Sequence, residues 1–195
     1  MTRPAISPKG IARREQILQT ATATLAVDGY RNSSLRGIAR ALGVEPAHIL
    51  YYFESREELL QAVVERWDDD AIAAVGGAVD ARTALDFYVA TVQHNLEIPG
   101  IVHLYLTLAA EAVHPGHSAH QFFLDRFHRA RGLLADGIRF EQAAGAIDAA
   151  YDADFEARTL IALADGLQLQ ALVDPAVDAP GDLALAIAKL RGTSA

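Results

Sequence analysis

The chain has 195 residues, enough for a sizeable core, and no cysteine, which excludes disulfides, thiolate metal sites and a cysteine nucleophile. Its formal net charge of -8 argues, as an average, against a polyanionic partner. The charge is unevenly distributed, because residues 1–56 hold eight Lys+Arg and four Asp+Glu, whereas residues 57–195 hold nine and twenty-one. The first segment has a net charge of +4 and the second a net charge of -12, so only the first is suited to attract phosphate groups.

The composition predicts an all-α protein. Ala, Leu and Arg are abundant, and Val and Ile form no alternating runs of the kind that strands need. The N-terminal MTRPAISPKG lacks the apolar core of a signal peptide, and the longest apolar runs are too short to span a bilayer. Together with the absence of cysteine, these features lead us to expect a soluble, cytoplasmic protein with no membrane contact.

A helical hairpin is predicted after a first helix over residues 9–27, which Asp28-Gly29 should end. Ser33 or Ser34 suits the N-cap of the second helix, and Gly43 its end. The apolar residues between them follow the spacing of one helical face; they are Leu35, Ile38, Ala39 and Leu42.

A third, short helix should begin at Pro46, which is tolerated in a first turn. Ile49 and Phe53 are four residues apart, so they should bury its inner side. The positions roughly opposite them then form an exposed strip, which consists of Ala47, His48, Tyr51 and Tyr52.

The rest of the chain also has helical periodicity. Ser55 and Glu58 have the spacing of a capping box, which predicts a helix start. Apolar spacing and Gly or Pro breaks predict further helices over residues 83–97, 101–113, 119–144, 154–173 and 181–190.

Three stretches, SSLRGIARALGVEPAHILYYF, FESREEL and LIALADGLQLQALVDP, occur in this order along the chain. Taken together, the sequence resembles the tetracycline-repressor (TetR-like) family. The resemblance implies a homodimeric one-component transcription regulator, with an N-terminal three-helix helix-turn-helix domain and a larger C-terminal helical domain that binds an effector and dimerises. We accordingly expect a flexible arm over residues 1–9, a DNA-binding domain over 10–54 and an effector-binding and dimerisation domain over 55–195.

The resemblance also implies roles at DNA, with the third helix in the major groove. Residues that match phosphate-contacting positions are Ser33, Ser34, Tyr52 and Arg56; those that match groove-facing positions are Pro46, Ala47, His48 and Tyr51. Arg36 either binds phosphate or merely solubilises the second helix. Leu50 departs from the pattern, because many relatives have a tyrosine there as a further phosphate contact.

Two other functions are alternatives to DNA-binding regulation. Tyr51 and Tyr52 could be packing residues, and the protein a helical small-molecule carrier or adaptor without a DNA role. An enzyme is not expected, since Gly-x-Ser-x-Gly, His-Glu-x-x-His and a P-loop lysine are all missing. The clustered carboxylates of residues 68–70 are typical of a solvated helix end.

An effector pocket is expected inside the acidic helical segment, because helical bundles bind ligands between their helices. The candidates combine apolar area with hydrogen-bonding groups, and plain core packing is the alternative for each of them: Trp67, Tyr88, His103, Tyr105, Phe123 and Phe127. His114, His117 and His120 suggest a metal site, but Pro115-Gly116 breaks the helical geometry. We therefore expect no metal and no cofactor.

Dimerisation is expected through the last two helices. Residues 154–173 have more apolar circumference than one domain normally covers, and a two-fold, four-helix interface would bury it. The side chains assigned to this interface are Leu160, Leu163, Leu167, Ala171, Leu183, Ile187 and Leu190. Two reading heads about one helical turn of DNA apart would bind a palindromic operator, and a small-molecule effector that changed their spacing would release it.

Overall fold

The computed structural model describes residues 7–32, 34–74 and 79–192; the expected contact at Ser33 lies outside these ranges. Over the described residues the protein has nine α-helices and no strand, which confirms the all-α prediction. The helices are α1 (Pro8–Asn32), α2 (Leu35–Leu42), α3 (Pro46–Leu50), α4 (Arg56–Ala74), α5 (Ala84–Leu96), α6 (Pro99–Glu111), α7 (His120–Ala143), α8 (Ala153–Val173) and α9 (Ala179–Leu190). Within those ranges no helix has both the length and the apolar character to cross a bilayer.

Local sequence signals set the boundaries of α1, α2 and α3. The backbone leaves helical geometry at Gly29 (φ 68°, ψ 173°), and a short helical continuation follows the kink. Ser34 Oγ accepts the backbone N–H of Gly37 at 3.1 Å and so caps α2, which ends at Gly43 in the left-handed conformation (φ 67°). Pro46 opens α3 as predicted.

Two later helices begin earlier than predicted. α6 begins at Pro99 instead of residue 101, because proline lacks an N–H and its fixed φ suits a first helical turn. α9 begins at Ala179 instead of residue 181, because Asp178 caps it by accepting the backbone N–H of Gly181 at 3.0 Å. At α4, the predicted cap is present: Ser55 Oγ accepts the Glu58 N–H at 3.0 Å, and the Glu58 carboxylate accepts the N–H of Glu54.

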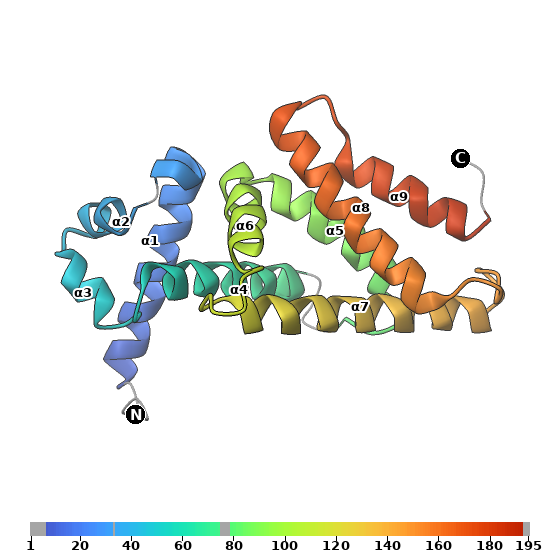
Figure 1. Cartoon of the computed structure of the whole chain (residues 1–195), viewed down its shortest axis with the longest axis horizontal. Helices are drawn as coiled ribbons and strands as arrows, with labels where there is room; N and C mark the ends of the chain where they lie inside the picture. Colours follow the sequence, from blue (N-terminus) through green and yellow to red (C-terminus); the bar gives the residue numbers. More distant parts are fainter. Residues whose placement is uncertain (1–6, 33, 75–78, 193–195) are drawn as a thin grey trace.

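The helices form a head and a body (Figure 1). The head is α1–α3, at one end of the molecule. α4 leads out of the head and passes below α6, and α5, α7, α8 and α9 make up the far part of the body.

Buried side chains form two clusters. The first, which we call the shared core, joins residues of α1–α4 to Leu104 and Leu108 of α6 and to Phe123 of α7. The second lies within α5, α7, α8 and α9 and the turn that precedes α8. The head thus has no separate core, and the division between residues 54 and 55 does not coincide with a break in packing. That division remains a prediction.

The contact between α1 and α6 is unusually close at Gly100. A Cβ atom placed on this glycine would lie 2.2 Å from the backbone oxygen of Leu25, a distance that backbone atoms cannot accommodate without moving. The glycine therefore lets the first turn of α6 lie directly against α1, where head and body meet.

We expect Gly100→Ala to lower the free energy of unfolding by about 1–3 kcal/mol, because the new methyl group overpacks the α1–α6 contact. Urea denaturation followed by circular dichroism measures the change. Gly132→Ala is the control: its Cβ meets nothing within 4 Å, and alanine should stabilise α7 by about 0.5–1 kcal/mol. Equal effects of the two substitutions would contradict the close contact.

Candidate functional site

The outer side of α3 is exposed and its inner side is buried. Ile49 and Phe53 are fully buried in the shared core, whereas 77% of Tyr51 is exposed. Ala47 and His48 are also exposed, and Pro46 and Tyr52 are half-buried. The outer side of this five-residue helix is therefore accessible to solvent, and a large aromatic residue, Tyr51, lies at its C-terminal end.

Three rings make a continuous surface there. Tyr52 lies edge-on to both His48 and Tyr51, with ring centroids 5.6 and 5.1 Å apart. His48 Nε2 accepts a hydrogen bond from Arg13 Nε of α1 at 3.3 Å. The sequence analysis did not identify Arg13, because no local signal marks a contact across 35 residues of chain.

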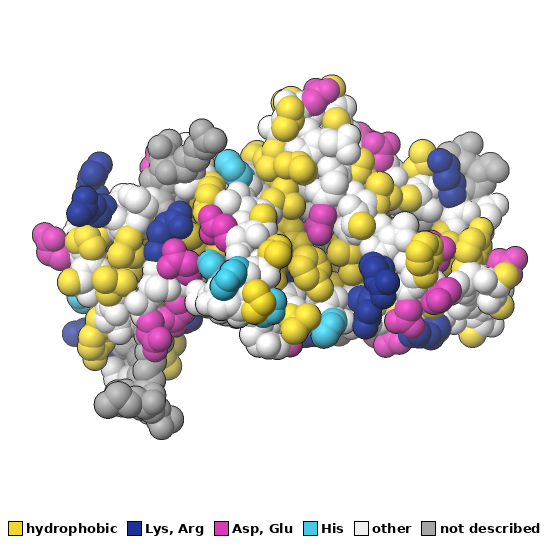
Figure 2. Space-filling model, in the orientation of Figure 1, with side chains coloured by type: hydrophobic (Ala, Val, Ile, Leu, Met, Phe, Trp, Pro, Cys, Tyr) yellow, Lys and Arg dark blue, Asp and Glu magenta, His cyan; other side chains and the backbone are white. Residues whose placement is uncertain are grey.

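The predicted phosphate-contacting residues surround this surface, and they differ in whether their polar groups already have partners within the chain. Ser34 is exposed, but its Oγ already accepts the helix-capping N–H of Gly37. Arg36 is exposed on α2, where Lys and Arg side chains extend from the end of the molecule (Figure 2). Arg56 opens α4 with its guanidinium 5.3 Å from the centre of the Tyr30 ring, and Glu57 lies 3.9 Å from it.

Tyr51→Ala should change the free energy of unfolding by less than about 0.5 kcal/mol, because the ring is largely exposed and lies against the ring of Tyr52, which is itself only half-buried. Ile49→Ala, on the opposite side of the same helix, should cost about 2–5 kcal/mol. Chemical denaturation of the two variants measures both changes in the free energy of unfolding. A large loss for Tyr51→Ala would mean that the ring is a packing residue.

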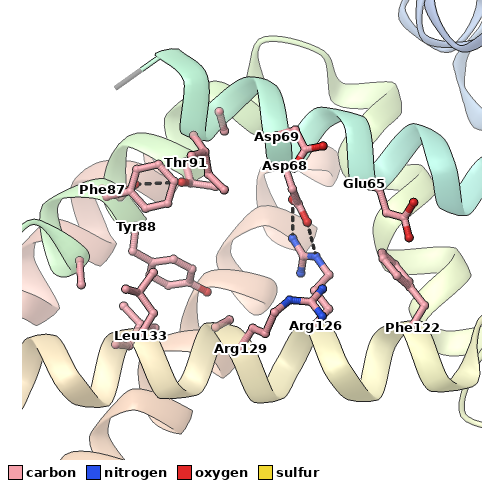
Figure 3. Close-up of a pocket in the computed structure, with 15 residues that line it drawn as sticks. Glu65, Asp68, Asp69, Phe87, Tyr88, Thr91, Phe122, Arg126, Arg129 and Leu133 are labelled. Atoms are coloured by element: carbon pink, nitrogen blue, oxygen red, sulfur yellow. Dashed lines mark hydrogen bonds and ion pairs between the residues drawn. The ribbon is translucent and has the colours of Figure 1, made fainter. Parts of the chain in front are cut away.

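A pocket of about 300 Å³ lies between α4, α5 and α7 (Figure 3). One part of its wall is apolar and is formed by Ala71, Ile72, Ala84, Phe87, Ala130, Leu133 and Leu134. The remainder is formed by Glu65, Asp68, Asp69, Tyr88, Thr91, Phe122, Arg126 and Arg129. Apolar walls with a few polar groups are typical of small-molecule sites.

Only Tyr88 of the six predicted effector-pocket residues lines this pocket. Trp67 stacks on His94 at 4.3 Å and donates its Nε1–H to Asn95 at 3.0 Å. The other four lie in or against core packing: Tyr105 and Phe123 belong to the shared core, Phe127 packs against both clusters, and the ring of His103 lies 5.3 Å from that of Tyr30. Helical spacing marks inward-facing aromatics, but it cannot separate those that line a cavity from those that fill the core.

A polar network begins in the pocket wall, at Asp68 and Arg126, and continues to Tyr105 and Asp165, which do not line the pocket. Arg126 makes two hydrogen bonds to Asp68, at 2.8 and 2.9 Å, and its guanidinium lies 4.5 Å from the centre of the Tyr105 ring. Tyr105 donates its hydroxyl to Asp165 of α8 at 3.0 Å. The carboxylate of Asp68, expected to be solvated, is therefore held against α7.

The pKa values of this network are shifted. Burial raises the pKa of Tyr105 and of Asp165, the latter against the opposing effects of the Tyr105 hydrogen bond and of Arg126. Burial alone would lower the pKa of Arg126, but the hydrogen bonds and charge of Asp68 raise it overall, so this guanidinium stays charged. The network links α4, α6, α7 and α8.

His114 and His117 lie between α6 and α7, and His120 is the first residue of α7; all three contact nearby backbone. His114 Nδ1 accepts the N–H of Gly116 at 3.0 Å, His117 Nδ1 accepts that of Ala119 at 3.2 Å, and His120 Nδ1 lies 2.8 Å from the Ala112 carbonyl. Nowhere in the described ranges do three or more His, Cys, Asp or Glu side chains group in a way that could hold a metal ion.

The interface assignment on α8 and α9 needs a correction. Five of its seven side chains are buried inside the single chain: Leu160, Leu167, Leu183, Ile187 and Leu190. Leu163 and Ala171 are half-buried against the same cluster. The apolar stripe that seemed to need a partner is covered by α5, α7 and the other helix of the pair, so these side chains leave a partner little or no surface.

A helix-turn-helix with an exposed outer side is joined to a helical body that contains a pocket, and this arrangement is typical of DNA-binding regulators. Comparisons with known proteins agree. The family model for bacterial regulatory proteins of the tetR family matches residues 17–63. The chain is 27% identical to the HTH-type transcriptional regulator PksA of Bacillus subtilis (strain 168), over 84% of this chain and 80% of that protein.

Two solved structures extend the likeness to most of the chain. A TetR-family transcriptional regulator from Rhodococcus sp. is 28% identical with a TM-score of 0.72, covering 92% of this chain and 99% of that one. A transcriptional regulator from Saccharomonospora viridis, solved in complex with choline, is 30% identical with a TM-score of 0.69, covering 89% and 94%. The chain belongs to the TetR family and is a helix-turn-helix transcriptional regulator.

Proposed function

We propose that the protein binds a palindromic double-stranded DNA operator as a homodimer, acts as a repressor and is released by a small-molecule effector. The observation that carries the DNA contact is the free outer side of α3, where 77% of Tyr51 is exposed beside His48 and Ala47. An α-helix fits the major groove, where side chains can reach base edges. Pro46, Ala47, His48 and Tyr51 would then read bases.

Phosphate contacts would come from the rim of the same surface. Arg36 and Arg56 carry the charge, Ser34 offers the N-terminus of α2, and Tyr52 offers its hydroxyl. Arg13 would act differently, because its hydrogen bond to His48 would orient the imidazole ring of that base-reading residue. The phosphate contacts position the head but do not select a sequence.

In the proposed dimer, each protomer would contact its partner through the solvent-exposed apolar face of α8. Phe155, Ala162, Leu169 and Val173 are spaced by seven, seven and four residues, which places them on one helical face, and all four are exposed. Hydrophobic side chains are prominent over the area of α6 and α8 in Figure 2. A second copy related by two-fold symmetry would cover this face and place two heads side by side.

The pocket supports effector control. A 30%-identical regulator holds choline, which supports a small-molecule ligand here as well. A ligand between α4, α5 and α7 can alter the position of α4, which begins at the phosphate candidate Arg56. Release follows if the ligand binds more tightly to a dimer whose heads are wrongly spaced for DNA.

Selection from random duplex oligonucleotides should yield a palindrome. His48→Ala should change which bases are preferred, whereas Arg56→Gln should weaken binding to all sequences alike and lower the salt slope by about 1. Arg131→Gln on α7, remote from the head, is the control and should leave affinity unchanged. A protein that selected no sequence and shifted no duplex at low salt would be a carrier or adaptor instead.

Leu169→Asp should convert the protein to a monomer in sedimentation experiments, because a carboxylate would be placed in the α8 interface. Operator affinity should fall by about a hundredfold or more, since the second head no longer binds within the same complex. Leu124→Asp, at a similarly exposed leucine of α7, should leave both properties unchanged. A dimer that survived Leu169→Asp would refute this interface.

A further inference from the structure

The pocket between α4, α5 and α7 has two unequal surfaces. Its apolar wall, with Phe87 and Leu133, suits a hydrocarbon chain. On the other side, Arg126 and Arg129 rise from α7 toward Asp68 on α4, and the Tyr88 hydroxyl is directed toward the same space (Figure 3). The site is therefore amphipathic, with the two arginines and the carboxylates of Asp68, Asp69 and Glu65 on the side away from Phe87 and Leu133 (Figure 3).

Two of these donors have no acceptor. Arg129 makes no ion pair with any residue in the described ranges. The Tyr88 hydroxyl makes no hydrogen bond within that same part of the chain, although most of the side chain is buried. Burial also raises the pKa of Tyr88, so its hydroxyl remains a donor at neutral pH. Arg129 is exposed and Tyr88 is half-buried, and both line the pocket, so a ligand oxygen there would give each of them an acceptor.

The third donor is already engaged by a carboxylate. Arg126 holds Asp68 through two parallel hydrogen bonds, the fork geometry in which guanidinium groups recognise carboxylates. Its side chain is only 20% exposed, yet it lines the pocket beside Arg129, one helical turn away. A second carboxylate entering the pocket would meet the same fork.

We propose that the effector is a small organic carboxylate with an apolar body, and that its carboxylate binds Arg129 and Tyr88 and competes with Asp68 for Arg126. This inference rests on the proposed function and specifies the chemistry of its effector. A cavity of about 300 Å³ is at the small end of ligand sites, which suits a body of roughly six to ten carbon atoms.

The pocket also contains groups that suit a cation. The aromatic residues Phe87 and Phe122 line it. Glu65 and Asp69 line it as well, and both are exposed to solvent, where their charges are screened. The comparison with two cationic probes described below therefore decides between the two chemistries.

The test is titration calorimetry of the full chain, without DNA, against hexanoate, octanoate and decanoate. Octan-1-ol, octyltrimethylammonium and choline are the matched probes without a carboxylate. At least one carboxylate should bind at least tenfold more tightly than octan-1-ol and the two cations. Tighter binding of a cation or the alcohol, or no binding of any carboxylate at millimolar concentration, overturns the proposal. Operator binding, measured separately without any ligand, tells this failure apart from failure of the proposed function.

Two substitutions test the donors. Arg129→Gln should weaken octanoate binding about ten- to a hundredfold, and Tyr88→Phe about fivefold, because each removes one donor to the carboxylate. The controls are Arg131→Gln on the same helix and Tyr151→Phe in the turn before α8, neither of which lines the pocket. Unchanged affinity in Arg129→Gln, or equal loss in its control, overturns the assignment.

Competition for Arg126 is tested by a pair of isosteric changes on α4. Asp68→Asn removes the charge and one of the two acceptors that hold Arg126 and should tighten octanoate binding about tenfold or more, whereas Asp69→Asn removes the same charge without freeing a donor and should have a much smaller effect. Equal effects of the two substitutions would mean that Asp68 acts only through its charge. They would overturn the proposal that the ligand carboxylate competes with Asp68 for Arg126.

Discussion

The shared core is the constraint on which the rest of the structure depends. Side chains from α1–α4 are buried together with Leu104 and Leu108 of α6, so the head cannot shift without disturbing the body. α4 belongs to this core near the head, and at Asp68 it is bound to Arg126 of α7. Interactions in the pocket and the presentation of α3 are therefore parts of one packing arrangement, which is what ligand control of DNA binding requires.

Sequence reasoning predicted the elements that local physics determines. The caps at Ser34 and Ser55, the left-handed glycine at residue 43 and the buried pair Ile49 and Phe53 all follow from spacing and backbone preference, and the structure confirms them. The exposure of Tyr51 followed from the same spacing, because a helix that buries one side must present the other.

Contacts across long stretches of chain could not be predicted in this way. The ion pair of Asp68 with Arg126 and the contact of Gly100 with Leu25 depend on how helices pack, which periodicity does not specify. The interface residues were misassigned for a related reason: an apolar stripe on a helix predicts burial, but the chain itself can supply the cover, as it does for Leu183 of α9. The combination of an aromatic ring and a hydroxyl group marked Tyr88 as a pocket candidate in the sequence. Only the fold shows that this hydroxyl has no hydrogen-bond partner among the described residues.

Amide hydrogen exchange of the Leu108→Ala protein tests most directly whether head and body share one core. Leu108 lies on α6 and is fully buried, so the account predicts faster exchange in α1, α2 and α4 as well as in α6. Leu183→Ala, in the second cluster, should instead speed exchange in α5 and α7–α9 and spare the head. Faster exchange confined to α6 in the Leu108→Ala protein would contradict the shared core.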